Sequence, residues 1–331
     1  MIAGGPVLVY GTGSIGSRHL NVLRERLGVA VVALPVRPER AEELSRSGFD
    51  VARSLKDVSA FRPKSSIVAT DTARHVEDAI ALLAFGDVLV EKPVAPIARG
   101  IASLASAASM SQRAVFVAFP FRFDAGFRAL AGHCGRIGPL LSVRIECESY
   151  LPNWRSQRDY RESYSARAAE GGVLRDLAHE LDYAVRLFGR PHGVFCGVAD
   201  RGILGIEAEE SADLWWEGRD CLPVSVHLDY LSPVSRRVVR VVGKLGTVTW
   251  DALEGTVILT HAGTPGKIEK FPVDRDGTMA RMLSAFLSDD ASEREWLATL
   301  DEGGFVAALT DAARRSAASG QIEPIGDWRA E

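Results

Sequence analysis

The sequence predicts an α/β protein in which a doubly wound, parallel-sheet domain precedes an α+β domain with a mostly antiparallel sheet. Three observations support this fold class. Short apolar runs alternate with helical segments as far as residue 118, a glycine-rich turn follows the first run, and runs of alternating polarity succeed one another beyond residue 140. Strands separated by helices pair in parallel through crossovers, whereas strands joined by tight turns pair antiparallel.

The size of the chain indicates two globular domains. Its 331 residues are too many for one ordinary core, and 47% apolar with 25% charged residues is the balance of an ordinary globular protein. The alternation of strands and helices ends near Pro120. We therefore expect domains at residues 1–120 and 121–331.

Several function classes are disfavoured by composition. A net charge of −4 without a run of Lys and Arg argues against a nucleic-acid partner. No apolar stretch approaches about 18 residues and no signal-peptide pattern opens the chain, so we expect a cytoplasmic protein without a membrane partner. The four cysteines form no C-x-x-C pair and are expected to be reduced thiols.

In the first domain the expected elements alternate in type. Apolar runs predict buried parallel strands, and the segments between them predict helices. Strands are expected at 7–10, 29–34, 66–69, 88–90 and 115–118, and helices at 15–27, 38–46, 76–85 and 97–110.

The second domain is expected to follow a different pattern. Residues 142–150 alternate between apolar and polar side chains, which is typical of a strand with one solvated face. Strands are expected at 142–150, 194–198, 212–216, 224–230, 238–242 and 256–260, and helices at 172–188, 281–287 and 305–318.

The turn after the first strand has the spacing G-x-G-x-x-G. It consists of Gly11, Thr12, Gly13, Ser14, Ile15 and Gly16, and it opens the first helix. In this context the glycines permit a tight turn, close approach of a pyrophosphate, and close helix–strand packing. The free N–H groups at the helix N-terminus favour phosphate. The sequence therefore predicts a Rossmann domain that binds a dinucleotide; a glycine-rich turn without a ligand is the alternative.

The end of the second strand bears on the choice of cofactor. An acidic residue there binds the ribose hydroxyls of NAD, but this chain has Arg37 and Arg40 instead. Because a guanidinium suits a 2′-phosphate, we expect NADP in preference to NAD. Alternatively, both arginines are solvated charges at a helix start.

Two segments carry candidate catalytic groups. Lys92, in Glu91-Lys92-Pro93, follows a strand and lies where ligands of such sheets bind. His179 lies opposite the apolar stripe of its predicted helix, with the carboxylate of Asp176 one turn away, as for a general acid/base and its orienting partner. A surface lysine and a solvated histidine are the alternatives. His179-Glu180 lacks the second histidine of H-E-x-x-H, so we expect no metal.

Three segments together resemble the Gfo/Idh/MocA family, the relatives of glucose-fructose oxidoreductase and inositol dehydrogenase. They are residues 11–19, Glu91-Lys92-Pro93, and residues 171–182. The resemblance implies hydride transfer on sugars or polyols, with Lys92 as catalytic lysine and Asp176 and His179 as the acid and histidine pair. It also implies that the second domain, an α+β domain, has a large, mostly antiparallel open sheet, and that a homodimer or homotetramer forms through this sheet.

Further site residues follow from the same resemblance. The step from Asp176 to His179 is three residues where the family commonly has four, so Asp182 is a possible substitute. Thr70, Asp71, Thr72, His75, Glu91 and Lys92 itself are implied to bind the cofactor, and Arg122 and Asp182 to bind substrate.

Residues 150–167 hold four arginines, one tryptophan and three tyrosines. Arginine pairs with carboxylate or phosphate, and aromatic rings cover the apolar faces of sugars. We expect Trp154, Arg155, Arg158 and Tyr164 to bind an anionic sugar, such as a sugar acid or a nucleotide-linked sugar. A solvated loop or a subunit contact is the alternative.

Two other functions stay open at this point. A glycosidase or epimerase that oxidises and re-reduces its substrate with a trapped NAD needs the same dinucleotide site. A non-catalytic regulatory protein that senses NAD(P) needs that site but neither Lys92 nor His179.

Overall fold

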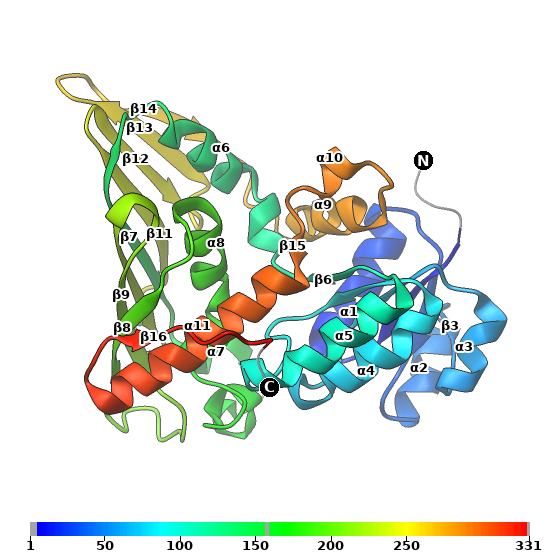
Figure 1. The fold of residues 1–331 in the computed structure, drawn as a ribbon. Helices are drawn as coiled ribbons and strands as arrows, with labels where there is room; N and C mark the ends of the chain where they lie inside the picture. Colours follow the sequence, from blue (N-terminus) through cyan, green and yellow to red (C-terminus); the bar gives the residue numbers. More distant parts are fainter. Residues whose placement is uncertain (1–4, 156–158, 330–331) are drawn as a thin grey trace. The chain divides into compact units, whose positions relative to one another are not determined.

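The computed structural model describes residues 5–155 and 159–329 (Figure 1). By its internal contacts the chain divides into two compact units. The first unit runs to Phe123 and adds Asp274–Phe305 and the residues from Trp328 onward, and the second comprises Asp124–Val273 and Val306–Asp327. In the described ranges, every helix is too short or too polar to span a bilayer.

The first unit is built on a seven-stranded sheet in the order β3-β2-β1-β4-β5-β6-β15. Neighbours among the first six pair in parallel, and β15 joins antiparallel at the edge. This is the Rossmann strand order, so the predicted fold class is confirmed. The strands are β1 (Val7–Tyr10), β2 (Val31–Leu34), β3 (Asp50–Val51), β4 (Ser65–Val68), β5 (Asp87–Val90), β6 (Val115–Val117) and β15 (Ala298–Thr299).

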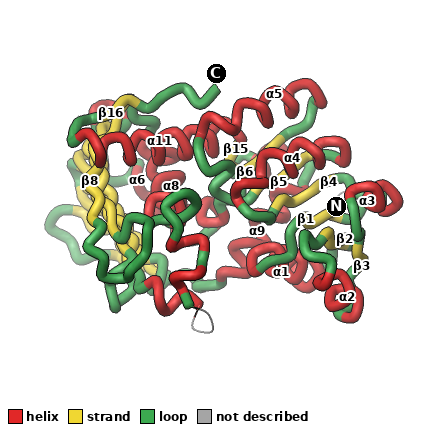
Figure 2. Tube along the Cα trace, turned by 90° about the horizontal axis from the view of Figure 1, so that it is seen from below, coloured by secondary structure: helices red, strands yellow, loops and turns green. Residues whose placement is uncertain are grey.

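Helices cover both faces of this sheet. Figure 2 shows α1 and α9 on one face and α4 and α5 on the other. The helices are α1 (Ser14–Asn21, continued by a π-helical turn at Val22–Arg26), α2 (Glu39–Arg46), α3 (Leu55–Phe61), α4 (His75–Leu82), α5 (Ala102–Ser111), α9 (Arg275–Leu287) and α10 (Ala291–Arg294). The buried strands are apolar on both faces because both are covered.

Helix α9 returns to the first unit from late in the sequence. Met282 and Phe286 are buried in the same core as Leu23, and Phe286 contacts Phe116 edge-on with ring centroids 6.1 Å apart. The predicted second domain spans residues 121–331 as one block. By contacts, residues 274–305 belong with the first unit, because the apolar side of α9 completes its core.

The second unit contains a nine-stranded sheet in the order β14-β13-β12-β11-β7-β10-β9-β8-β16. β7 and β10 pair in parallel, and the other neighbours pair antiparallel, which confirms a mostly antiparallel sheet. The strands are β7 (Leu140–Glu148), β8 (Gly193–Ala199), β9 (Ser211–Glu217), β10 (Pro223–Asp229), β11 (Arg236–Gly243), β12 (Gly246–Asp251), β13 (Thr256–His261), β14 (Lys267–Lys270) and β16 (Glu323–Pro324).

One face of the second sheet is covered by helices. These are α6 (Ala125–Cys134), α7 (Val173–Asp176), α8 (Ala178–Phe188) and α11 (Leu300–Ser319) from Val306 onward (Figure 1). Phe127 of α6, Tyr183 of α8 and Trp250 of β12 form an aromatic cluster with ring centroids 5.3–5.8 Å apart. Each aromatic pair adds to the stability that burial alone provides.

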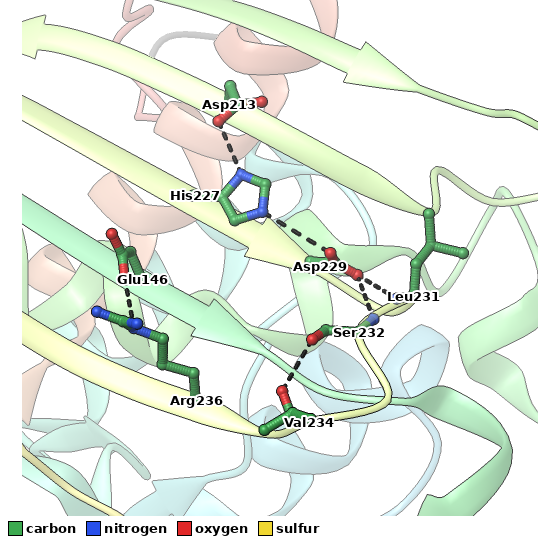
Figure 3. Close-up of polar contacts among 8 residues, drawn as sticks. All are labelled: Glu146, Asp213, His227, Asp229, Leu231, Ser232, Val234 and Arg236. Carbon is green, nitrogen blue, oxygen red and sulfur yellow. Dashed lines mark hydrogen bonds and ion pairs between the residues drawn. The ribbon is translucent and has the colours of Figure 1, made fainter.

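The opposite face of this sheet carries polar side chains in cross-strand rows. His227 of β10 bonds Asp213 of β9 through Nδ1 at 2.8 Å, and its Nε2 lies 3.8 Å from Asp229 (Figure 3). Glu146 of β7 pairs with Arg236 of β11 nearby. Burial alone lowers the pKa of His227, but the bond to Asp213 and the surrounding carboxylates outweigh it and raise the pKa.

We expect His227 to make stability depend on pH. Because its folded-state pKa is raised, its contribution to the free energy of unfolding is complete below the ordinary value of about 6.5 and is lost as pH rises through the raised value. The pair is partly solvated, so the effect should be below about 1 kcal/mol. Urea unfolding at about pH 6 and pH 8 should show a smaller difference for His227→Gln than for the unmodified chain. An equal difference in both proteins would contradict this role.

Candidate active site

The glycine turn lies between the carboxyl ends of β1 and β4. Gly11 has φ +91°, and a Cβ there would lie 2.4 Å from the carbonyl oxygen of Ala69. A Cβ on Gly16 would lie 1.9 Å from the carbonyl oxygen of Gly11. A Cβ on Gly13, by contrast, would meet no described atom within 4 Å. Two glycines thus serve close packing, and the third leaves open space at the start of α1, which fits a pyrophosphate.

Arg40 folds back onto this turn from the start of α2. Its Nη2 lies 3.3 Å from the carbonyl oxygen of Thr12 and 3.3 Å from Ser17 Oγ, while Nη1 donates to Glu43 at 2.6 Å. Arg37 is exposed. The guanidinium of Arg40 is therefore fixed beside the turn rather than free in solvent.

Lys92 follows β5 at the same edge of the sheet, next to a cis peptide bond to Pro93. Glu91 is buried, and its two carboxylate oxygens have different partners. Oε1 accepts from His19 Nε2 at 2.7 Å, and Oε2 accepts from the backbone N–H of Lys92 at 3.2 Å. The segment that carries Lys92 is thus fixed by side-chain bonds as well as by the strand.

The loop after β4 contains Thr70, Asp71 and Thr72, and ends at His75. His75 is 2% exposed; its Nδ1 lies 2.8 Å from the carbonyl oxygen of Pro93 and its Nε2 3.0 Å from that of Thr70. This histidine bridges the loops that follow two adjacent parallel strands. Asp71 is exposed and Thr72 half-buried, so these two remain accessible for a ligand.

In the second unit, Asp176 ends α7 and His179 lies in the first turn of α8. Leu177, with ψ 29°, separates the two helices, so the prediction of one continuous helix over 172–188 was wrong, and the helical angle expected between Asp176 and His179 does not apply across the break. Within α8, His179 is half-buried whereas Leu181 and Ala184 are buried, as its predicted place opposite the apolar stripe requires. Helix α7 begins directly after a turn at Gly171 and Gly172 that packs tightly: a Cβ on Gly171 would lie 2.3 Å from the carbonyl oxygen of Tyr164.

Asp176 is buried and accepts a hydrogen bond from Tyr230 Oη at 2.6 Å. Burial and the charge of Asp176 raise the pKa of Tyr230 well above its usual value, so the phenol stays protonated and donates. Asp182 is also buried, whereas His179 is half-buried. Of these groups, His179 is the one with the greater solvent access.

The segment 150–167 is linked to Asp176 through Tyr230. Trp154 is 40% exposed, donates from Nε1 to Ser149 Oγ at 3.1 Å, and meets the ring of Tyr230 edge-on at 5.3 Å between centroids. Tyr164 is 36% exposed. Arg158 and the side chain of Arg155 lie outside the described residues. An exposed ring anchored in this way suits the apolar face of a sugar.

Arg122 lies in the first unit and is 1% exposed, with Nη1 3.0 Å from Glu302 Oε1. Glu302 and Thr299 form a capping box at the start of α11, in which Glu302 Oε2 accepts from the backbone N–H of Thr299 at 2.9 Å. The visible role of Arg122 is thus to hold this helix start, and its assignment to substrate stays a prediction.

Two family models match the chain. Residues 6–119 match the oxidoreductase family with an NAD-binding Rossmann fold, and residues 133–249 match the GFO/IDH/MocA C-terminal domain. The chain belongs to the Gfo/Idh/MocA family. It is an NAD-binding oxidoreductase of that family, as the three sequence segments predicted. No curated protein matches the sequence.

Solved Gfo/Idh/MocA-type structures have the same fold. A levoglucosan dehydrogenase complexed with NADH has a TM-score of 0.84 at 18% identity, with 98% of this chain and 99% of that one covered. An inositol dehydrogenase homologue from Azotobacter vinelandii complexed with NAD⁺ has a TM-score of 0.83 at 17% identity, with 98% and 100% covered. An oxidoreductase from Agrobacterium radiobacter with NAD⁺, L-tartaric acid and magnesium has 0.83 at 16%, with 98% and 99% covered.

The structure brings the site residues of this Gfo/Idh/MocA chain together in two groups. The first unit holds the glycine turn, Thr70–Thr72, His75 and Lys92, and the second holds Asp176, His179, Asp182 and Trp154. That Lys92 meets His179 stays a prediction. Sequence reasoning assigned no role to His19 or Tyr230, because both act through partners more than fifty residues away. In the described residues no group of three His, Cys, Asp or Glu side chains could hold a metal ion.

Proposed function

We propose that this protein transfers a hydride between the nicotinamide of NAD(P) and the carbinol carbon of a sugar, sugar acid, nucleotide-linked sugar or polyol. The observation that supports this most directly is the placement of Lys92 and the open space at Gly13 on one edge of the sheet. Structural neighbours complexed with levoglucosan or L-sorbose have the same architecture, which supports a carbohydrate substrate.

Each polar group in this proposal has one task. When bound, a nicotinamide dinucleotide would supply the hydride acceptor or donor. Lys92 donates a hydrogen bond to the reacting oxygen, and His179 takes the hydroxyl proton during oxidation or returns it during reduction. Asp176, with one oxygen bound by Tyr230, orients either His179 or Lys92. The backbone at Gly11–Gly16 holds the pyrophosphate.

A panel of sugars, sugar acids and polyols, each with NAD and with NADP, tests the proposal through the absorbance of the reduced nicotinamide. Turnover with one class supports it. A dinucleotide that co-purifies with the protein, together with turnover that leaves the absorbance of the reduced nicotinamide unchanged, would instead favour a glycosidase or epimerase. Binding of dinucleotide without turnover of any substrate, in a chain whose function is indifferent to Lys92 and His179, would favour a regulatory protein.

The finer choice of cofactor rests on Arg40, whose guanidinium is fixed beside the glycine turn at the start of α2. In a Rossmann domain the group that selects the adenosine ribose comes from this region, just after the second strand. We propose that it binds the 2′-phosphate of NADP, with Arg37 beside it. Arg40→Ala should weaken NADP binding by roughly 10- to 100-fold and change NAD binding by less than about 3-fold, because a bond to a charged group is lost only with NADP.

Titration of both dinucleotides by protein fluorescence measures this effect. Arg46→Ala, at the exposed end of the same helix, is the matched control and should leave both affinities unchanged. An equal loss for NAD and NADP would mean that Arg40 only supports the turn, and NADP preference would then be rejected.

We also propose that the substrate carries a negative charge, bound by Arg155 and Arg158, with Trp154 and Tyr164 against its ring. Replacing both arginines by alanine should raise KM for an acidic sugar and leave KM for a neutral analogue unchanged. An unchanged KM for the acidic sugar would remove the idea. The homodimer or homotetramer implied by the family stays part of this proposal.

A further inference from the structure

We propose that His19 and His75 are positioning residues for Lys92, which hold its segment against the dinucleotide turn from two sides. The inference rests on the proposed function, in which Lys92 is the catalytic lysine. Among the cofactor-binding residues expected from the sequence, it reassigns Glu91 and His75 to the support of Lys92. Its basis is a closed series of short contacts within the first unit.

The first side of this support is His19, from the helix that the glycine turn opens. Its side chain is fully buried, and Nε2 donates to Glu91 Oε1 at 2.7 Å. Among the described residues Nδ1 has no hydrogen-bond partner, so Glu91 is the polar group that the ring serves. Glu91 Oε2 in turn accepts from the backbone N–H of Lys92. Helix α1 is therefore tied to the residue that carries the ammonium group.

The second side is His75, whose ring lies between the carbonyl oxygens of Pro93 and Thr70 at 2.8 and 3.0 Å. Burial lowers the pKa of His75, although both carbonyl oxygens oppose the shift, so the ring is neutral near neutral pH. A neutral imidazole has one N–H. The neutral ring thus donates to one of the two carbonyl oxygens, and beside the other it acts as a buried spacer between the two loops.

Both series of contacts lead back to the glycine turn at Gly11–Gly16. Thr70 follows Ala69, whose carbonyl lies so near Gly11 that a Cβ there would be 2.4 Å away. One route therefore runs from Gly11 through Thr70 and His75 to Pro93, and the other from Gly16 along α1 through His19 and Glu91 to Lys92. Hydride transfer depends steeply on alignment, and a displacement of about 1 Å costs about 100-fold in rate. Fixing Lys92 to the turn on two sides supplies that alignment.

The test compares His19→Leu and His75→Leu with variants that keep one N–H donor, His19→Gln and His75→Asn. Each leucine variant should lower kcat by roughly 10- to 100-fold while the dissociation constant of the dinucleotide changes by less than about 3-fold. The amide variants should have a higher kcat than the leucine variants because they keep an N–H donor. If the histidines only filled space, the amide and leucine variants would have the same kcat. His133→Leu removes a histidine–glutamate contact of the same kind in the second unit, to Glu269 at 3.3 Å, and should leave kcat unchanged.

A double-mutant cycle completes the test. If His19 acts through Glu91, His19→Leu in a Glu91→Gln background should lower kcat no further than either change alone. Additive losses would overturn that route. Should a leucine variant not fold, as seen from its melting temperature, the amide variants and Glu91→Gln still decide the question.

Lys92→Ala measured in parallel separates the two proposals. Full activity of Lys92→Ala would reject the proposed function itself. An inactive Lys92→Ala beside fully active His19→Leu and His75→Leu would overturn the positioning role alone. A weakened dinucleotide affinity with full kcat at saturation would also overturn it, because both histidines would then serve the cofactor rather than Lys92.

Discussion

Lys92→Ala should lower kcat by about 10²- to 10⁴-fold, the usual contribution of a positioned acid–base or hydrogen-bonding group. Lys92 follows the carboxyl end of β5, and the glycine turn proposed to hold the dinucleotide is formed by other residues. The dissociation constant of the dinucleotide should therefore change little. Single-turnover kinetics with saturating cofactor would separate the loss of chemistry from any loss of binding.

Lys64→Ala serves as the control, because Lys64 is an exposed lysine just before β4 in the same unit. It should retain full turnover. If Lys92→Ala keeps the activity of Lys64→Ala, the ammonium group takes no part in the reaction. If both cofactor affinity and turnover collapse together, Lys92 contributes to binding rather than to chemistry.

The Rossmann unit was predictable because its strands are apolar on both faces and its glycine turn is local in sequence. The same reasoning missed β3 and α3, since a two-residue strand and a seven-residue helix carry too few positions to show a period. It also missed β14, whose four residues are mostly exposed charges. Helix α9 packs in the core of the first unit, far from it in sequence, and no local sequence pattern predicts this long-range packing.

The candidate site likewise contains residues that local motifs predict and residues whose roles depend on distant partners. Lys92 and the glycine turn follow from short motifs placed directly after strands. The bond between Tyr230 and Asp176 joins residues 54 positions apart, and that between His19 and Glu91 joins residues 72 apart. Arg122, which its family position implies to bind substrate, also pairs with Glu302, 180 residues away, and no local pattern in the sequence indicates that contact. Non-local partners decide what a charged side chain does.

A second large effect is expected from the ion pair beneath α8. Arg237 Nε donates to Glu180 Oε1 at 2.8 Å, and Tyr183 Oη donates to the same oxygen at 3.1 Å. Glu180 is fully buried. Burial alone would lower the pKa of Arg237, but the carboxylate of Glu180 raises it above its usual range, so the pair is ionised. Burial and the Glu180 charge also raise the pKa of the neighbouring Cys147 thiol to about 12.

Arg237→Met should therefore lower the free energy of unfolding by about 3–5 kcal/mol, because it leaves the carboxylate of Glu180 buried without its counter-ion. Urea unfolding measures the change, and Arg236→Met is the matched control. Arg236 is the preceding residue on β11, yet it pairs with Glu146 near solvent and should cost less than about 1 kcal/mol. The double variant Glu180→Gln/Arg237→Met should lose less than Arg237→Met, since no buried charge is then unpaired. If Arg236→Met and Arg237→Met lower the free energy of unfolding equally, burial of the Arg237–Glu180 pair does not determine how much it stabilises the fold.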